Sequence, residues 1–241
     1  MTMTTTIQKS IVYIEANLRR DIGVVDVADA VSYSQFYFSR QFSLSTHISV
    51  YDYILKRKLS EAYKTLFTKA PRILDLALQY GFQSHEVFTR AFRKMFGENP
   101  SEAAVYKPLL IYERIDDAYL HFLGDLKIDI LECEYPDCHF EVESQADAEA
   151  GLLMVLSENL LSCNTVLAGK LESEAGPLLG FRLNGLKTVL RVHHTDVTHA
   201  IRYFLDNFYD ADRMASNFIL LEKDKEHIDF IIPGNRYKRK L

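Results

Sequence analysis

A basic helix face stands out in residues 81–97, GFQSHEVFTRAFRKMFG. Aromatic residues recur there at intervals of four, the spacing that places side chains on one side of an α-helix: Phe88, Phe92 and Phe96. Between them lie three basic residues, Arg90, Arg93 and Lys94. Guanidinium and ammonium groups donate strong hydrogen bonds to anionic groups. The pattern predicts a helix whose aromatic side is buried and whose basic side faces an acidic partner.

The charge of the chain is unevenly distributed. The formal net charge of the 241 residues is −5, which by itself argues against a nucleic-acid partner. Residues 1–113, however, hold 14 Lys and Arg against 11 Asp and Glu, a net of +3, and the remainder carries −8. This asymmetry is a reason to consider nucleic acid as a partner of one of the two halves.

Length, apolar runs and cysteines limit the class of protein. The chain is long enough for one large domain or two modest ones. No apolar run approaches the roughly 20 residues of a membrane helix, and the opening MTMTTTIQKS lacks the apolar core of a signal peptide. Cys133, Cys138 and Cys163 form no disulfide framework. We therefore expect a cytoplasmic protein without a membrane partner.

Residues 7–106 have helical periodicity throughout, with apolar residues three and four positions apart and short polar breaks between segments. Pro71 and Pro100 stand where helices begin or end. About seven short helices are predicted, an all-α arrangement.

A repeat within these helices explains the basic face. Residues 24–42 align with residues 73–92 at an offset of 49, which becomes 50 after one extra residue in the second copy. The matched pairs are Asp26 and Asp75, Ala28 and Ala77, Ser34 and Ser84, Phe38 and Phe88, Arg40 and Arg90, and Phe42 and Phe92. A helix with a small alanine, a tight turn, a serine cap and a second helix form a helix-turn-helix motif. The second helix of such a motif enters the major groove of DNA.

Residues 51–103, from YDYILKRKLSEA through ILDLA and GF to FTRAFRKMFGENPSEA, resemble the signature of AraC-type bacterial transcription regulators. The resemblance covers about residues 7–106 and implies a DNA-binding domain with two helix-turn-helix motifs. Ser32 departs from it, because the family commonly has a glycine in that turn, and the ending PSEAAVY is looser than the usual form.

The resemblance also implies which side chains face DNA. Base-facing positions are Gln35, Phe36, Ser39 and Arg40 in the first copy and His85, Glu86, Val87, Thr89 and Arg90 in the second. Arginine can bind guanine with two hydrogen bonds, glutamate can accept one from cytosine, and valine can contact the thymine methyl group. The residues suited to phosphate are Lys56, Arg57, Lys58, Arg93 and Lys94. Alternatives remain: Arg40 and Arg90 could be ordinary solvated helix charges, Glu86 could cap its helix or repel DNA, and His85 could contact phosphate.

The pattern changes after Pro108. Strand-like alternation in 126–135 and 139–144 is followed by a helical segment at 146–161 and a strand at 165–172. A strand at 186–194, a helix at 196–209 and strands at 217–223 and 227–233 follow, after a loop marked by Gly176, Pro177, Gly180 and Gly185. We predict an α+β domain of two tandem units, β-β-α-β and β-α-β-β, at residues 126–241, joined to the DNA-binding domain (1–106) by a linker at 107–125.

The pattern of 126–233 is similar to the GyrI-like domain, in which two such units form an effector cleft. Asp229, in HIDFIIP, occupies the family's acidic position. That implies a cleft for a small cationic or amphipathic effector. Its candidate residues are Asp229, Glu222, Glu143, Tyr203, Phe204 and Phe208. The alternatives are solvent-facing strand carboxylates, a packed helix face, and a protein-interaction or dimerisation module without a ligand.

Other chemistries have weaker support. His193, His194 and His199, and Cys133, Cys138 and His139, are metal-ligand types, but their spacings fit no known zinc motif. Nucleophile, phosphate-loop and metalloprotease motifs are absent. We therefore predict a regulator rather than an enzyme, without catalytic residues, metal or cofactor. Its expected partner is promoter DNA; RNA polymerase, an effector, and the choice between monomer and homodimer stay open.

Overall fold

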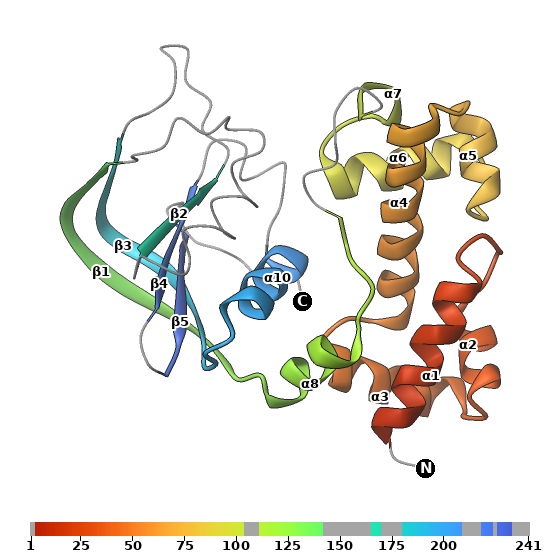
Figure 1. The fold of residues 1–241 in the computed structure, drawn as a ribbon, viewed down its shortest axis with the longest axis horizontal. Coiled ribbons are helices and arrows are strands. Elements are labelled where there is room, and N and C mark those ends of the chain that lie inside the picture. The colour runs from red at the N-terminus through yellow and green to blue at the C-terminus, as the bar shows by residue number, and fades with distance from the viewer. Residues whose placement is uncertain are drawn as a thin grey trace. The chain divides into compact units, whose positions relative to one another are not determined.

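The computed structural model describes residues 3–103, 111–141, 165–169, 180–208, 218–223 and 226–232. The chain divides into two compact units, Met1–Asp125 and Leu126–Leu241, hereafter the N-terminal and C-terminal units (Figure 1). No helix in these described ranges is both long and apolar enough to cross a membrane.

The N-terminal unit is all-α. Its helices are α1 (Met3–Ala16), α2 (Val24–Ala30), α3 (Gln35–Thr46), α4 (Val50–Lys69), α5 (Ile73–Gln79), α6 (His85–Phe96), α7 (Pro100–Ala103) and α8 (Asp117–Asp125). Helices α1 to α7 confirm the predicted all-α arrangement of the first hundred residues. The long helix α4 connects the pair α2–α3, the first motif, to the pair α5–α6, the second motif (Figure 1).

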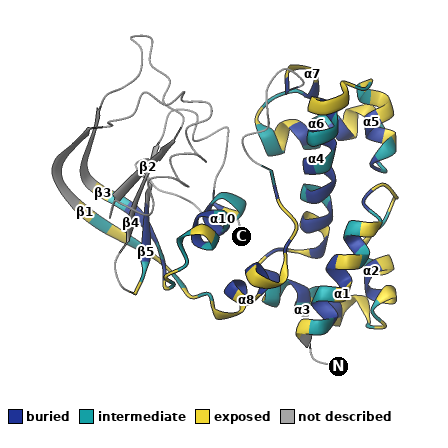
Figure 2. Cartoon of the chain, in the orientation of Figure 1, coloured by how far each residue is buried: buried dark blue, intermediate teal, exposed yellow. Residues whose placement is uncertain are grey.

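Each motif packs its aromatic side against α4. Phe42 and Tyr53 are in ring contact at 5.7 Å in the first motif, and Phe92 and Tyr63 at 5.1 Å in the second. Figure 2 shows the buried positions of α4 along much of its length, between exposed ones. Because α4 contributes to both cores, the two motifs share one structural support.

Residues 111–125 do not form the expected linker. They belong to the N-terminal unit. Their buried residues are Tyr112, Ile115, Tyr119, Leu120, Phe122 and Leu123. These large apolar side chains gain by leaving water, so the segment packs instead of remaining extended in solvent. Residues 107–110 lie outside the described residues.

The C-terminal unit is built on an antiparallel sheet. Its strands are β1 (Ile128–Glu141), β2 (Thr165–Gly169), β3 (Gly180–Val192), β4 (Phe218–Lys223) and β5 (Ile228–Ile232), in the order β1-β3-β5-β4-β2. Helix α10 (Val197–Asn207) packs on one face through Phe204, whose ring stacks on Phe230 at 4.7 Å. The succession β3, α10, β4, β5 has the β-α-β-β order of the second predicted unit.

The observed structure differs from the first predicted unit in two respects. Two strands were expected, at 126–135 and 139–144. Both segments contribute to the single strand β1, and β3 pairs with β1 on both sides of the junction between them. A register shift between Tyr135 and Cys138 absorbs the irregularity that includes Pro136. Gly180 and Gly185, expected in a loop, pair with β1 as part of β3. The helix predicted at 146–161, together with Gly176 and Pro177, lies outside the described residues.

Candidate nucleic-acid interface

The two motifs make their turns with the same hydrogen bonds. The Tyr33 N–H donates to the Ala28 carbonyl at 3.0 Å, and the Phe82 N–H donates to the Ala77 carbonyl at 3.0 Å. The residue before each donor is left-handed, with φ of 61° at Ser32 and 73° at Gly81. The structure therefore confirms the internal repeat at the level of the backbone.

Serine caps start both second helices, as predicted. The Ser34 hydroxyl accepts the Tyr37 N–H at 3.4 Å, and the Ser84 hydroxyl accepts the Val87 N–H at 3.3 Å. These bonds satisfy N–H groups that a helix start leaves unpaired. The caps fix where α3 and α6 begin, and so fix which residues occupy their first turns.

The aromatic side of each second helix is core. Phe38, Phe42, Phe88 and Phe92 are buried, which confirms that they are not base-stacking groups. Phe96, also expected in the core, is only half-buried, at the last turn of α6.

In the first motif, the predicted base-facing residues lie on the opposite side of α3. Gln35, Phe36 and Arg40 are exposed, and Ser39 is half-buried. The Phe36 side chain is 80% exposed, which is unusual for so large an apolar group. A phenyl ring at the start of a recognition helix can contact the methyl group of thymine.

In the second motif, His85, Val87 and Arg90 are exposed at the start of α6. Thr89 is half-buried, and its hydroxyl lies 3.5 Å from Nε2 of His85. Exposed and half-buried side chains thus recur at the same positions of α3 and α6, on the side away from the core.

Glu86 is exposed too, and it serves its own helix. Hydrogen bonds from the Ser84 hydroxyl and from its own backbone N–H lower the pKa of Glu86 below the ordinary value. The carboxylate also lies in the first turn of α6, where negative charge is favoured. The capping alternative for Glu86 therefore has direct structural support, and hydrogen bonding to cytosine would compete with it.

One exposed residue of this surface escaped the sequence prediction. Tyr37 is 43% exposed and stacks on Tyr33 at a ring distance of 5.5 Å. It occupies the position that corresponds to Val87 at the offset of 50. Applying the repeat to every position, instead of to the matched residues alone, would have identified it.

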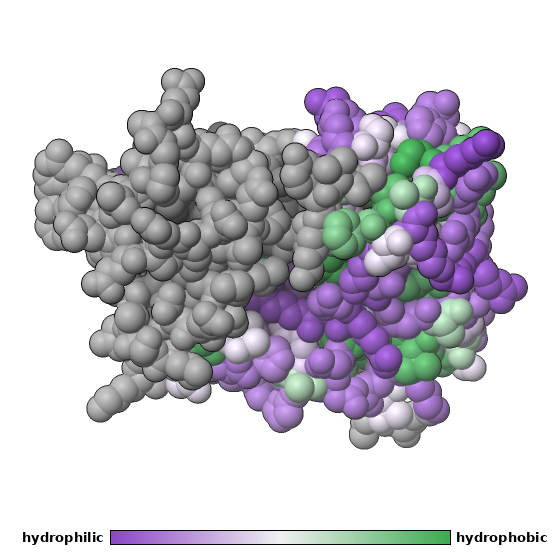
Figure 3. Space-filling view, turned by 45° about the horizontal axis from the view of Figure 1, so that its top comes forward, coloured by the Kyte–Doolittle hydropathy of each residue, from purple (hydrophilic) through white to green (hydrophobic). Residues whose placement is uncertain are grey.

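Two of the five predicted phosphate ligands are wrong. The Arg57 and Lys58 residues are only 4% and 6% exposed, so neither can reach DNA from the surface of α4. Lys56 is half-buried, with its ammonium 4.9 Å from the centre of the Tyr112 ring. Arg93 and Lys94 are exposed in the last turns of α6. Figure 3 shows hydrophilic residues over most of the visible face of this unit, with small apolar groups among them.

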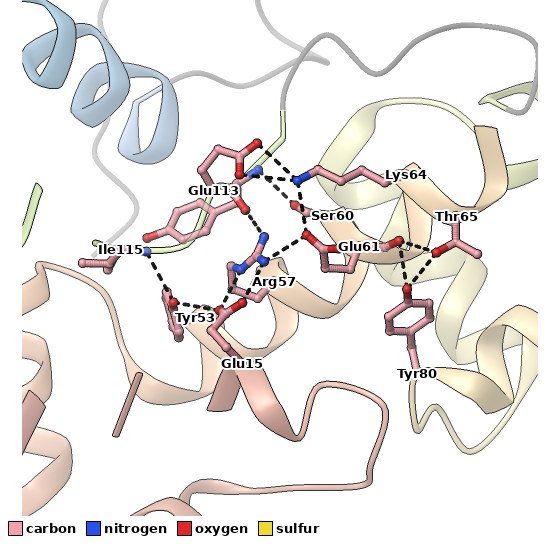
Figure 4. Close-up of polar contacts among 11 residues, drawn as sticks. Glu15, Tyr53, Arg57, Ser60, Glu61, Lys64, Thr65, Tyr80, Glu113 and Ile115 are labelled. Carbon is pink, nitrogen blue, oxygen red and sulfur yellow. Dashed lines mark hydrogen bonds and ion pairs between the residues drawn. The ribbon is translucent and has the colours of Figure 1, made fainter. Parts of the chain in front are cut away.

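Arg57 instead forms the centre of a buried polar network (Figure 4). Its guanidinium donates to both carboxylate oxygens of Glu15 at 2.8 Å, to Glu61 at 2.9 Å and to the Tyr112 carbonyl at 2.7 Å. Burial would lower the pKa of Arg57, but the two carboxylates outweigh it and raise the pKa above its ordinary value. The charge is therefore retained and neutralised inside the protein.

Lys58 is held in a similar way, by the main chain. Its ammonium donates to the Arg20 carbonyl at 2.7 Å. Burial lowers the pKa of Lys58, and the nearby Asp21 partly offsets this. The sequence pattern could not show that Arg57 and Lys58 differ from charged residues on the surface. They are buried only because α1 and residues 111–115 pack on α4.

The candidate effector residues of the C-terminal unit do not form a common site in the described residues. Asp229 is buried and accepts two hydrogen bonds from Arg191, at 2.8 and 2.7 Å. Glu222 lies opposite Asp229 in the backbone register of β4 and β5. Glu143 lies outside the described residues. The aromatic walls Tyr203, Phe204 and Phe208 are buried around α10, because they pack against the sheet and one another.

Two histidines of this unit, His193 and His199, have carboxylate partners. The His193 ring lies 2.7 Å from Asp129, and the His199 ring lies 2.7 Å from Asp196, which caps α10. Among the side chains that the structure describes, no group of three or more His, Cys, Asp or Glu is arranged to hold a metal ion.

The N-terminal unit is similar in sequence to known proteins. A family model described as a helix-turn-helix domain matches residues 27–104. The HTH-type transcriptional regulator YbfP of Bacillus subtilis (strain 168) is 40% identical over 94 residues, which are 39% of this chain and 32% of that protein. The chain thus spans about a third of the length of YbfP.

Two shorter relatives are matched over most of their length. The transposon Tn10 TetD protein of Escherichia coli is 37% identical over 41% of this chain and 71% of its own length. The regulatory protein SoxS of Escherichia coli (strain K12) is 34% identical over 40% of this chain and 90% of its own length. The two serine-capped helices α3 and α6 lie within the matched helix-turn-helix domain, and the chain belongs to the AraC family.

Proposed function

We propose that this protein is a sequence-specific regulator that reads two successive major grooves of one promoter site, with α3 in one and α6 in the other. Successive major grooves on one side of DNA lie about 34 Å apart. Both readers belong to one chain, so a monomer can occupy such a site.

The observation that carries this proposal is the repeated surface. Arg40 and Arg90 are equivalent in the repeat, and both are exposed on the side of the helix away from the core. Each guanidinium can form two hydrogen bonds with one guanine, worth about 1–3 kcal/mol of discrimination. The N-terminal half is only mildly basic, so specific contacts would dominate over nonspecific attraction.

Selection of bound sequences from a pool of random double-stranded DNA tests the proposal with the full chain. We expect a site with two conserved blocks about one helical turn apart. The Arg40→Ala variant should relax preference in one block, and Arg90→Ala in the other, with affinity for the selected site falling about 5- to 150-fold in each case. Arg19→Ala, an exposed arginine outside both reading helices, is the control. A single block, or loss in the same block for both variants, would contradict the two-groove model.

For the C-terminal unit, two functions were open, an effector sensor and a protein-interaction module. We infer that the interaction module is the better supported. The GyrI-like resemblance would use Asp229 to attract a cation, but Arg191 already neutralises this carboxylate. A cationic ligand would first have to displace the half-buried Arg191 from the buried Asp229 carboxylate, which costs free energy.

An interaction surface is available on the described sheet. Strand β1 is at one edge of the sheet, and edge strands offer unpaired backbone groups to another strand. Ile130 and Leu186 on β1 and β3 are 45% and 58% exposed. Light scattering of the full chain against concentration tests for dimers, and Ile130→Lys should weaken them. A thermal shift with organic cations that Asp229→Asn abolishes would instead establish the sensor.

A further inference from the structure

Residues 111–115 return along α4, away from the second motif that precedes them in sequence (Figure 1). Three side chains of α4 hold this return path, at positions that share one helix face. The Ser60 hydroxyl accepts the Tyr112 N–H at 2.9 Å, and Arg57 donates to the Tyr112 carbonyl at 2.7 Å. The Tyr53 hydroxyl accepts the Ile115 N–H at 3.4 Å. Because these bonds involve the backbone of 112–115, the path is fixed independently of most of its side chains (Figure 4).

The path ends at α8, which docks against the first motif. Helix α8 lies against α3, and its Asp117 accepts a hydrogen bond from Gln8 of α1 at 2.9 Å. Phe122 and Leu123 of this helix are buried. Nε2 of His47, the residue that ends α3, lies 3.1 Å from the Leu123 carbonyl. The first reading helix therefore has a support that follows it by some seventy residues in sequence.

The second reading helix ends differently. Gly97 is the equivalent of His47 at the offset of 50, and both residues are left-handed caps, with φ of 80° and 58°. Their backbone N–H groups make the same bond, to Arg93 and to Ser43. Only the histidine has a ring that can reach a neighbour. The cap of α3 is thus tied by its side chain to α8, whereas the cap of α6 has no side chain for such a contact.

We propose that residues 112–125 are a positioning element for the first reader: docked α8 sets the orientation of α3, and so the affinity for the half-site that α3 reads, without acting on α6. The C-terminal unit begins at Leu126, directly after α8. The inference rests on the proposed reading of DNA by α3 and α6.

The test uses full-length variants. Phe122→Ala removes a buried ring from α8. The matched control is His121→Ala, at the preceding position, where the side chain is 81% exposed. His47→Gly gives α3 the same cap residue as α6 and removes the ring that lies 3.1 Å from the Leu123 carbonyl of α8. Two quantities are measured: amide hydrogen exchange of α3 and α6 without DNA, and affinity for the selected site and for versions with one half-site scrambled.

We expect Phe122→Ala and His47→Gly to speed exchange in α3 about tenfold, with α6 unchanged. Affinity for the intact site should fall about tenfold, and affinity for the site lacking the α3 half should stay as in the parent chain. Equal effects on both helices or both half-sites, or no effect of His47→Gly, would overturn the proposal. If selection yields no two-block site, the two-groove reading fails, and hydrogen exchange still decides whether α8 supports α3 alone.

Discussion

The first and second motifs use the same backbone turn but meet different neighbours. Ser32 and Gly81 occupy equivalent left-handed positions. Ser32 is exposed, so its side chain extends into solvent. A side chain at Gly81 would place Cβ 2.8 Å from the Arg20 carbonyl oxygen and 3.0 Å from the Asp21 nitrogen. The glycine of the second turn is therefore required by packing, and a serine is tolerated in the first.

That contact also explains how the motifs are held relative to each other. The loop after α1 lies between the Gly81 turn and the Lys58 ammonium, which binds the Arg20 carbonyl. Helix α4 is thus not the sole connection between the two halves of the N-terminal unit. Two copies of one motif have therefore diverged where one of them touches a third segment, while their internal hydrogen bonds stay the same.

The largest expected effect comes from the buried network that both halves share. Arg57→Met should lower the free energy of unfolding of the N-terminal unit by about 3–5 kcal/mol, because Glu15 loses the guanidinium that neutralises it. Urea unfolding followed by far-UV circular dichroism measures this. Lys69→Met, at an exposed position of the same helix, is the control. A loss of DNA affinity without a loss of stability would restore the phosphate-binding hypothesis for Arg57.

Gly81→Ala and Ser32→Ala test whether packing distinguishes the two turns. Gly81→Ala should cost about 2–4 kcal/mol, since it adds left-handed strain to a collision with the backbone at Arg20. Ser32→Ala replaces one side chain by another at the same φ and should change stability by less than about 0.5 kcal/mol. The same unfolding measurement applies to both. A loss of only about 1 kcal/mol for Gly81→Ala, the strain of one left-handed residue, would show that the φ angle alone, and not packing, selects glycine.

The serine caps should behave alike in the two motifs. Ser34→Ala and Ser84→Ala each remove one hydrogen bond to a backbone N–H, which costs about 1 kcal/mol. Thermal unfolding measures the loss of stability in the two alanine variants, with Ser34→Thr and Ser84→Thr as conservative controls. A loss at Ser84 much above that at Ser34 would show that Glu86 depends on the Ser84 hydroxyl as well.

The smallest effect concerns charge at the ends of the reading helices. Arg93 in α6 corresponds to Ser43 in α3 at the offset of 50. If Arg93 contacts phosphate, Arg93→Ala should reduce the slope of log affinity against log salt by about 0.9. Titrations of the selected DNA at several salt concentrations measure it. Ser43→Ala should leave the slope unchanged, and the same change in both variants would remove the assignment of Arg93 to phosphate.

The reading helices could be found from sequence because their signals are local. Serine caps, alanines and aromatic residues at helical spacing act within one motif, and the repeat shows each of them twice. The burial of Arg57 and Lys58 could not be found in this way, because their partners Glu15, Arg20 and Tyr112 are 38 to 55 residues away. The ion pair between Arg191 and Asp229 escaped for the same reason, since it depends on strand register.

By itself, the sequence determined the all-α first half, its two helix-turn-helix motifs and, apart from Tyr37, the exposed side chains at the start of α3 and α6. Only the tertiary structure decided which charges reach solvent, that Gly81 faces a backbone, and that α8 packs beside the first motif. The physical reason is the distance along the sequence over which each interaction acts. Helix periodicity and capping depend on neighbours within a few positions, whereas burial and ion pairing depend on segments that folding brings together from distant parts of the chain.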